Sequence, residues 1–529
     1  MPAQSSPHAL RPTTPLSTSL QAVADLTGAT TATPASAEVR VTGIEQRSNA
    51  VRAGDLFAAL PGANAHGARF AADAIANGAV AVFTDAAGAE LIGDVAVPVL
   101  VREQPRAVLG ELSAEIYGHP SDRLRIIGIT GTSGKTTTSY LVEAGLAAAG
   151  LSTGLIGTIE TRIGGQRVPS ALTTPEAPQL HAMFAAMVEQ GVDAVVMEVS
   201  SHALALGRVD GVRFAVGAFT NLSQDHLDFH SDFEDYFAAK RRLFDADSPV
   251  AARTTVICVD DEWGTRLAGD LVEPVTVSTT GAATWQVSGD VKTTGGEQEF
   301  TAAGPDGELT VRLRLPGRYN VANALLAVAT CAAAGVDPAV AAPALAVVDV
   351  PGRMQRVEHG QDFLAVVDYA HKPAAIESVV TTLRGHLTEA GVGRLAVVLG
   401  AGGDRDVAKR PLMGAAAARA DLLIVTDDNP RTEDPADIRS AVVAGAHELP
   451  ATDRGEIREI GDRAAAIAAA LDWARSGDVV LVAGKGHEVG QEIKGVKHPF
   501  DDREVVAAAL NALRRRHSPH TDSEDLTVS

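Results

Sequence analysis

Short apolar runs alternate with helical segments from residue 121 onward. The run LRIIGIT is followed by the helical segment GKTTTSYLVEAGLAAAG, and then by the runs DAVVMEV and FAVGAFTN. After Pro351 the same rhythm returns in FLAVVDYA, RLAVVLGAGG, DLLIVTDDNP and DVVLVAGKG. Strands that alternate with helices in this way are typical of βα units on a largely parallel sheet. The pattern therefore predicts an α/β protein with two such sheets, the second of them doubly wound.

The same pattern divides the chain into domains. A chain of 529 residues exceeds the size at which one hydrophobic core stops growing, and three domains fit best. The Gly-rich polar interval 280–310 is expected to form turns and short strands. The predicted segments are a mobile tail with one short helix over 1–37, a small α/β domain over 38–120, a central domain over 121–350, a second doubly wound domain over 351–515 and a polar tail over 516–529.

Composition excludes several classes of protein. A net charge of −21 argues against non-specific binding to nucleic acid and to an anionic membrane, so local groups must hold any anionic ligand. Cys258 and Cys331 cannot form a disulfide framework, which favours a reducing cytosol. The first residues lack the basic start and apolar core of a signal peptide, and no apolar run has the roughly 18 residues of a membrane span. We therefore expect a cytoplasmic protein without a nucleic-acid partner or membrane insertion.

A Gly-rich segment between strand and helix carries the strongest chemical signal. In GITGTSGKTTTS, residues 128–139, glycines let backbone N–H groups approach phosphate, and the helix N-terminus attracts anions. Lys135 can reach the β- and γ-phosphates of a nucleotide, and Thr136 can hold Mg²⁺. The loop is a variant of the G-x-x-x-x-G-K-[ST] motif, because Ile129 stands at the first glycine position. Strand, Gly-Lys-Thr and helix in series favour nucleotide binding over a plain turn.

Acidic and histidine residues follow the next two strands. Glu198 ends the run DAVVME, where a carboxylate can bind a metal ion; its alternative role is to cap the next helix. His226 follows the strand after that, and we expect it at the same edge, because ligands of open parallel sheets bind beyond the carboxyl ends of the strands. An H-x-x-x-H pair such as His226 and His230 is more often structural than metal-binding.

One lysine occupies an apolar helical position. In HSDFEDYFAAKRRLF, residues 230–244, Ser231 and Glu234 fit a capping box, and apolar residues recur at three- and four-residue steps. Lys240 lies on this stripe, and its stem could snorkel to water. A lysine buried beside Mg²⁺ would instead lose its proton easily, since desolvation and nearby cations disfavour the ammonium. The neutral amine could add CO₂ and become an anionic carbamate, which is a further oxygen ligand.

Eleven separated motifs together resemble one family. They appear in the order GTSGKTT, TTPE, MEVSSHAL, NLSQDHLDFH, YFAAKRRLF, GRYNVANALLA, PGRMQRVE, VDYAHKP, GAGGDRDVAKRPLM, DNPRTEDP and GKGHEVGQ, and cover most of residues 40 to 505. The chain resembles the Mur ligases of peptidoglycan synthesis, in particular those that add meso-2,6-diaminopimelate to UDP-MurNAc-L-Ala-D-Glu. The resemblance implies an ATP- and Mg²⁺-dependent amide ligase, a small N-terminal domain, a P-loop-type ATPase domain in the centre and a Rossmann-like C-terminal domain. We also expect a monomer.

The resemblance implies roles for individual residues. Lys240 would be carbamylated and would bind Mg²⁺ with Thr136, Glu198 and His226; Lys135, Lys240 and His226 would be the catalytic residues. The implied ATP-binding residues are Gly131, Thr132, Ser133, Gly134, Lys135, Thr136, Thr137, Asn323, Arg353 and Asp368. The implied residues for the uridine nucleotide and its sugar-peptide are Ser48, Ala63, Asn64, Ala65, Thr173, Thr174, Ser200 and Arg208. The implied diaminopimelate-binding residues are Arg405, Asp428, Asn429, Pro430, Arg431, Gly484 and Glu488. The chain departs from the family pattern at residues 47–49, where RSN replaces DSR, and at Leu206 and Lys372.

Several readings stay open from the sequence alone. Diaminopimelate differs from lysine by one carboxylate, and Arg431 supplies a planar fork able to bind it; a surface pair with Glu433 or Asp434 is the alternative. A ligase that adds L-lysine and a ligase like folylpolyglutamate synthase are the nearest rivals. A nucleotide-dependent switch without catalysis is a rival of another class, and it would need the loop but neither Lys240 nor the arginine cluster.

Overall fold

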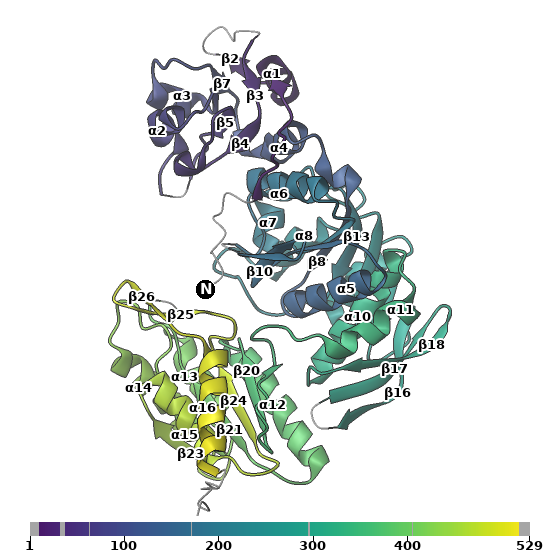
Figure 1. The fold of residues 1–529 in the computed structure, drawn as a ribbon, viewed down its shortest axis with the longest axis vertical. Coiled ribbons are helices and arrows are strands. Elements are labelled where there is room, and N and C mark those ends of the chain that lie inside the picture. The colour runs from purple at the N-terminus through teal and green to yellow at the C-terminus, as the bar shows by residue number, and fades with distance from the viewer. Residues whose placement is uncertain are drawn as a thin grey trace, which may run out of the picture. The chain divides into compact units, whose positions relative to one another are not determined.

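The computed structural model describes residues 10–31, 38–62, 64–170, 172–294, 297–404 and 406–517. The chain forms two compact units (Figure 1). The first comprises residues up to Gly289 with Thr301–Val311 and Ala322–Ala346, and the second comprises Asp290–Phe300, Arg312–Val321 and the residues from Val347 on. Among the described residues, no helix combines the length and the apolar character needed to cross a bilayer.

A small mixed sheet forms the N-terminal part of the first unit. Its strand order is β2-β7-β6-β5-β4, in which only β2 is antiparallel. The strands are β2 (Thr30–Thr31), β4 (Gly43–Glu45), β5 (Asp55–Ala58), β6 (Ala81–Thr84) and β7 (Val99–Val101), and the helices are α1 (Leu20–Thr27), α2 (Ala71–Ala76), α3 (Ala86–Ile92) and α4 (Leu109–Ile116). Strands β1 (Thr18–Ser19) and β3 (Arg40–Val41) pair separately.

The expectation of a mobile tail over 1–37 is wrong for residues 10–31. The short helix exists as α1, but Leu20 and Val23 on it are buried in the core of the N-terminal sheet. Their apolar spacing on one face, which a Pro-, Ser- and Thr-rich composition hides, gives the segment enough buried surface to stay folded.

Residues before α1 fasten the N-terminal sheet to the central domain. Arg11 Nη1 donates to both carboxylate oxygens of Asp55 at 2.8 Å, and the pair is largely buried. Thr13 and Thr14 donate their backbone N–H and hydroxyl groups to Glu189, the last residue of helix α6 (Ala177–Glu189). These bonds, led by that of the Thr14 hydroxyl, lower the pKa of Glu189 to about 2.

Exchange of Glu189 should therefore weaken the first unit in a pH-dependent way. The folded pKa of Glu189 is depressed, so its contribution is fully present above the unfolded value of 4.5 and is lost as pH falls towards about 2. We expect Glu189→Gln to lower the thermal midpoint at neutral pH only slightly, because an exposed carboxylate contributes less than about 1 kcal/mol to the free energy of unfolding. The deficit should shrink below pH 4.5. Glu448→Gln is the matched control, since Glu448 is an exposed residue that ends helix α14 (Pro435–Glu448). A deficit that persists unchanged at acid pH would contradict the assignment.

An eleven-stranded sheet forms the centre of the chain, in the order β11-β10-β9-β12-β8-β13-β14-β15-β16-β17-β18. The strands from β9 to β16 run parallel in this order. The strands are β8 (Arg125–Thr130), β9 (Thr153–Ile156), β10 (Glu160–Ile163), β11 (Gln166–Pro169), β12 (Ala194–Glu198), β13 (Phe214–Phe219), β14 (Thr254–Cys258), β15 (Val275–Ser278), β16 (Trp285–Thr294), β17 (Glu297–Gly304) and β18 (Gly307–Leu313). The helices besides α6 are α5 (Lys135–Ala148), α7 (Ser201–Ala205), α8 (Phe233–Arg241), α9 (Glu262–Asp270), α10 (Arg318–Ala333) and α11 (Pro338–Ala344).

Two local predictions in this domain need correction. Within 280–310 the predicted turn is present at 305–306, but the strands β16, β17 and β18, the last of which continues beyond the interval, are longer than predicted, with 10, 8 and 7 residues. Buried residues alternate along β17, so one face packs inward despite the polar composition. Helix α8 is capped by Asp232, whose side chain accepts from Asp235 N at 2.8 Å, rather than by Ser231.

The C-terminal domain is a doubly wound sheet, as the apolar runs predict. Its order is β19-β20-β24-β21-β22-β23, parallel except for β19. The strands are β19 (Gln355–Arg356), β20 (Leu364–Asp368), β21 (Leu395–Leu399), β22 (Leu422–Val425), β23 (Glu456–Glu459) and β24 (Val479–Ala483); the helices are α12 (Pro373–Ala390), α13 (Lys409–Ala417), α14 (Pro435–Glu448), α15 (Arg463–Trp473) and α16 (Asp502–His517). Helices α12, α13 and α14 pack on one face and α15 and α16 on the other, where Figure 1 shows both in front of the sheet. A hairpin of β25 (Gly490–Ile493) and β26 (Val496–Pro499) lies before α16.

Candidate active site

The Gly-rich loop joins the central strand β8 to helix α5, as predicted. Gly131 and Gly134 have φ values of 144° and 87°, a region that residues with a Cβ rarely adopt. A Cβ at Gly134 would lie 2.3 Å from Asn323 Oδ1, and one at Gly131 would lie 1.9 Å from Thr220 Oγ1. The loop therefore needs glycine for its conformation and for the close approach of its neighbours.

This close approach gives a prediction about Gly134→Ala. The new methyl group must displace Asn323 and distort the loop at the start of α5, so we expect affinity for ATP to fall about 10- to 100-fold, given a strain of about 1–3 kcal/mol. Gly150→Ala is the control, because Gly150 also has a positive φ, 83°, but a Cβ there meets nothing within 4 Å. Titration with a fluorescent ATP analogue would measure both. Equal affinities in the two variants would contradict the steric argument.

The end of strand β13 holds the loop in place. Ser133 N donates to Asn221 Oδ1 at 3.0 Å, and Thr220 Oγ1 donates to Ser133 O at 2.7 Å. Thr220 and Asn221 were not predicted as site residues. Their signal was present in the run FAVGAFTN, which ends in two polar residues on a strand next to β8.

Glu198 and Thr136 meet at the carboxyl ends of the adjacent strands β12 and β8. Thr136 Oγ1 lies 3.0 and 2.9 Å from the two oxygens of Glu198, which is 1% exposed. Thr158, which the sequence did not single out, also donates its N–H to Glu198 at 2.7 Å and its hydroxyl at 3.1 Å. Glu198 does not cap the next helix, because Ser200 accepts from Ala203 N and caps α7. The carboxylate is thus held by neutral donors, with no ion pair recorded for it among the described residues.

Lys240 is buried at this site and does not snorkel to water. Lys240 is 1% exposed. Its Nζ donates to Gly131 O at 2.9 Å and lies 4.4 Å from the centre of the Tyr236 ring. Lys135 Nζ donates to the same carbonyl, at 2.9 Å. Burial, and after it the charge of Lys135, hold the pKa of Lys240 well below its usual value of 10.5. Lys240 therefore has the environment that favours a neutral amine.

The two histidines of the H-x-x-x-H pair have different surroundings. His230 is buried between Ser201 Oγ, 3.0 Å from its Nε2, and Asp235 Oδ2, 3.2 Å from its Nδ1. His226 has a φ of 55° and a half-exposed ring whose centre lies 6.1 Å from that of Tyr236. Both rings thus lie near Tyr236, the tyrosine that contacts Lys240: the centre of the buried His230 ring is 5.1 Å from that of Tyr236, and the more exposed His226 ring is 6.1 Å from it.

The predicted sugar-peptide residues lie together beside this edge. Thr173 Oγ1 is 3.1 Å from Thr158 Oγ1. Thr174 Oγ1 donates a hydrogen bond to the backbone O of Glu198 at 2.9 Å and accepts one from Ser200 N at 3.1 Å. Arg208 Nε lies 2.8 Å from Glu176, in the loop that carries the two threonines. Three hydroxyl groups, from Thr173, Thr174 and Ser200, and the guanidinium group of Arg208 therefore lie beside Glu198.

The predicted uridine residues lie in the N-terminal sheet domain. Ser48 begins a short 3-10 helix, Ser48–Ala50, and its backbone O accepts from Asn77 Nδ2. Asn64 and Ala65 are exposed in the turn that Gly62 N closes by donating to Ala65 O. Ala63 lies outside the described residues.

Two predicted ATP residues belong to the second unit. Asp368, at the end of β20, accepts from Met354 N and Ala370 N, both at 2.7 Å, and burial raises its pKa although Arg353 opposes this. The Arg353 guanidinium group lies over the ring of Tyr369, 4.5 Å from its centre. The positive charge of Arg353 thus acts on Asp368, which ends strand β20 of the C-terminal sheet.

The predicted amino-acid residues converge at the ends of β22 and β24. Arg431 Nη1 donates to Gly403 O at 2.6 Å and its Nε lies 3.4 Å from Glu492, so the alternative pairing with Glu433 or Asp434 does not occur. Asn429 Nδ2 donates to Glu488 Oε2 at 2.9 Å. Asp428 and Pro430 are buried beside them, Gly484 has a φ of 114°, and Arg405 lies outside the described residues. Glu433 instead pairs with Arg410.

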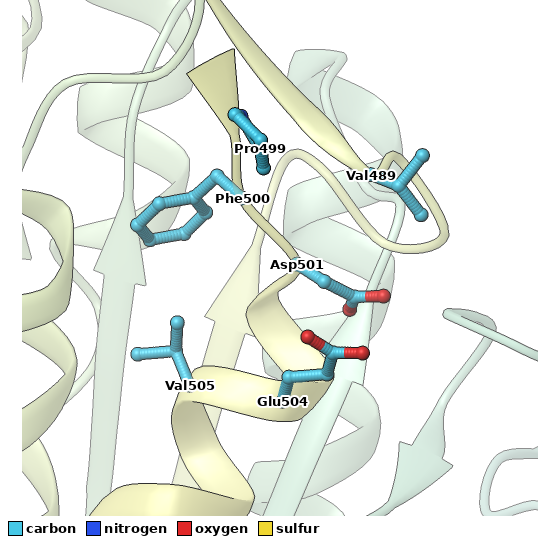
Figure 2. Close-up of a pocket in the computed structure, with 6 residues that line it drawn as sticks. All are labelled: Val489, Pro499, Phe500, Asp501, Glu504 and Val505. Carbon is cyan, nitrogen blue, oxygen red and sulfur yellow. The ribbon is translucent and has the colours of Figure 1, made fainter. Parts of the chain in front are cut away.

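A surface hollow of about 310 Å³ lies next to this segment (Figure 2). Its lining residues are Val489, Pro499, Phe500, Asp501, Glu504 and Val505. None of them was predicted as a site residue, and the Asp501 carboxylate is paired with Arg503. The lining of the hollow thus includes none of the converging side chains, although Val489 directly follows Glu488.

Three family models match the chain over most of its length. They are the Mur ligase family catalytic domain over residues 40–117, the Mur ligase middle domain over 129–331 and the Mur ligase glutamate ligase domain over 352–486. Two relatives named UDP-N-acetylmuramoyl-L-alanyl-D-glutamate–2,6-diaminopimelate ligase are similar along nearly the whole chain. That of Corynebacterium efficiens is 56% identical, covering 89% of this chain and 90% of its own; that of Streptomyces avermitilis is 53% identical, covering 94% and 98%.

Solved structures agree with these matches. A structure of a UDP-N-acetylmuramoyl-L-alanyl-D-glutamate–2,6-diaminopimelate ligase has a TM-score of 0.68 and 32% identity, and it covers 94% of this chain and all of its own. A folylpolyglutamate synthase of Mycobacterium tuberculosis has a TM-score of 0.55 over 77% of this chain and 94% of its own, but at 20% identity it shows a shared fold alone. With the loop, Glu198 and Lys240 at one sheet edge, and with three family models in sequence order, this chain belongs to the Mur ligase family of ATP-dependent ligases.

Proposed function

We propose that this protein uses ATP to join meso-2,6-diaminopimelate to the D-Glu carboxylate of UDP-MurNAc-L-Ala-D-Glu. The convergence of Lys135, Thr136, Glu198 and Lys240 at the carboxyl ends of β8 and β12 is the observation that carries the phosphoryl-transfer half of this proposal. The names of relatives that are 53–56% identical support the choice of substrates.

The proposed reaction consists of two successive displacement steps. A D-Glu carboxylate oxygen attacks the γ-phosphorus of ATP and ADP leaves, which gives an acyl phosphate. The amine of diaminopimelate then attacks the acyl carbon, and inorganic phosphate leaves as the amide forms and the amine loses its proton. Such phosphoryl transfer needs alignment and charge neutralisation more than covalent help. The loop N–H groups and Lys135 would orient the phosphates and balance their charge.

The residues at this edge fit Mg²⁺. Glu198 is a buried carboxylate that neutral donors hold, and Thr136 adds a hydroxyl oxygen; Mg²⁺ is usually bound by one or two carboxylates together with substrate phosphates. The described residues contain no cluster of three His, Cys, Asp or Glu side chains able to hold a metal ion, so phosphate, carbamate and water oxygens would complete the shell. When bound, Mg²⁺ would neutralise phosphate charge. As a carbamate, Lys240 would supply such an oxygen; His226 would lie nearby, beside Tyr236.

The remaining residues suit the other substrates. Thr173, Thr174, Ser200 and Arg208 would hold the sugar-peptide beside Glu198, and the N-terminal domain around Ser48, Asn64 and Ala65 would hold the uridine nucleotide. Asp368, Arg353 and Asn323 would contribute to ATP binding. Arg431 would bind the distal carboxylate of diaminopimelate, in competition with Glu492, which lies 3.4 Å from it.

One assay tests this function. ADP release should require UDP-MurNAc-L-Ala-D-Glu and should be far faster with meso-diaminopimelate than with L-lysine. Equal turnover of L-lysine would refute the proposed specificity and support a lysine-adding ligase. Near-zero ATP turnover with every substrate present would favour a non-catalytic nucleotide switch.

A further inference from the structure

Lys485 is a fully buried cation to which the sequence assigned no role. It follows β24, and its side chain has no solvent exposure. Its Nζ lies 3.4 Å from Asp428 Oδ1, 3.0 Å from Asn429 Oδ1 and 3.5 Å from Glu488 Oε2. A buried ammonium group is costly unless oxygen atoms surround it. The chain thus keeps a charge at the centre of the residues proposed to bind the amino acid.

Lys485 contributes to the orientation of the Asn429 amide. An ammonium group only donates hydrogen bonds, so the atom of Asn429 that faces it must be the oxygen. The same Oδ1 also accepts from Glu492 N at 3.0 Å. The Asn429 NH₂ group is therefore directed to the opposite side, where it donates to Glu488 Oε2 and could share a ligand carboxylate. Without Lys485, one of the two donors that select this orientation would be lost.

Lys485 also controls the local charge. It contacts one oxygen of Asp428 and one of Glu488, and so separates two carboxylates that would otherwise repel each other. The buried Arg463–Asp502 pair nearby is neutral overall. Lys485 against Asp428 and Glu488 therefore leaves a net negative charge at this point, which suits the ammonium group of an amino acid. The nearby Arg431 supplies the positive group that suits a carboxylate.

We propose that Lys485 is a positioning residue for the amino-acid substrate: it fixes the Asn429 amide and the Asp428 and Glu488 carboxylates without touching the reacting atoms. This inference rests on the proposed function, because it assumes that these three residues bind the amino acid. It concerns binding of the second substrate and not the activation of the first by ATP.

Steady-state kinetics of Lys485→Met test the proposal. Loss of hydrogen bonds to charged groups should raise the KM for meso-diaminopimelate about 10- to 100-fold, with the KM values for ATP and for UDP-MurNAc-L-Ala-D-Glu changed less than about twofold. Lys497→Met is the control, since Lys497 is an exposed lysine on the neighbouring hairpin. Lys485→Gln keeps a hydrogen-bond donor but not the charge, so it should raise the KM for meso-diaminopimelate less than Lys485→Met does. It replaces Lys485→Met in the test if that variant does not fold.

A double-mutant cycle distinguishes positioning from a general structural effect. If Lys485 acts through Asn429, Asn429→Ala and Lys485→Met together should raise the KM for the amino acid little more than the larger single change. Additive effects, or equal changes in all three KM values, would overturn the inference. Wild-type turnover is measured first, and the cycle uses whichever amino acid the wild type accepts. Preference for L-lysine would refute the proposed specificity alone, and absence of any turnover would overturn both proposals.

Discussion

Lys240→Ala is expected to lower kcat about 10²- to 10³-fold, with the chain still folded. The proposed carbamate is one of few anionic groups near the phosphates, and loss of one preorganised electrostatic group at a reacting centre typically costs this much. Because the alanine side chain leaves space beside Gly131 O, a small carboxylate could occupy it. Addition of acetate should therefore restore part of kcat, whereas the same concentration of chloride should not.

Lys240→Met is the matched control for this rescue. Methionine fills the space, so acetate should have no effect on its rate. Methionine should also raise thermal stability at neutral pH in buffer depleted of CO₂. The pKa of Lys240 is lowered in the folded chain, so the unfolded chain takes up a proton that the folded chain resists, which reduces stability at every pH below about 10.5. Acetate rescue of both variants, or of neither, would contradict a carboxylate-like role for this side chain.

Arg431→Ala should lower kcat/KM for meso-diaminopimelate about 10³- to 10⁴-fold while leaving ATP affinity unchanged. A site built to pair with a ligand group discriminates by up to about 10⁴ when one member of the pair is missing. For the same reason the wild type should use L-lysine poorly. Arg431→Lys should recover little, because a single ammonium group does not reproduce the planar two-point contact.

Arg458→Ala is a suitable control for Arg431→Ala. Arg458 is a partly exposed arginine of the same domain, paired with Glu456 on β23. Its loss should leave the kinetics with diaminopimelate unaltered. If Arg431→Ala used diaminopimelate as well as Arg458→Ala does, the proposed carboxylate contact would be wrong.

Much of the fold was predictable because buried parallel strands have sequences that are short apolar runs. The predicted runs became β8, β12 and β13 in one sheet and β20, β21, β22 and β24 in the other. The packing of the residues before α1 was not predictable in this way. It depends on hydrogen bonds from Arg11 to Asp55 and from Thr14 to Glu189, which are distant in sequence.

The candidate site was predictable only where residue type and spacing are unusual. A lysine on an apolar helical stripe left burial and snorkelling to water as two alternatives for Lys240. Its contact with Gly131 O joins residues 109 positions apart and depends on strand order, so the sequence could not decide between them. Thr158 is a common residue type at an ordinary position, so nothing in the local sequence marks it, whereas Asn221 is one of two polar residues that end an apolar run. Thr158 acquires its role because it follows β9, the neighbour of β12, and Asn221 because it follows β13, the neighbour of β8.

Carbon-13 NMR of the protein in labelled bicarbonate most directly tests whether a carbamylated Lys240 forms part of the ATP site. A carbamate resonance should appear for the wild type, should be absent from Lys240→Met, and should shift on addition of Mg²⁺ and an ATP analogue. A wild-type spectrum without that resonance, or one identical to that of Lys240→Met, would contradict it.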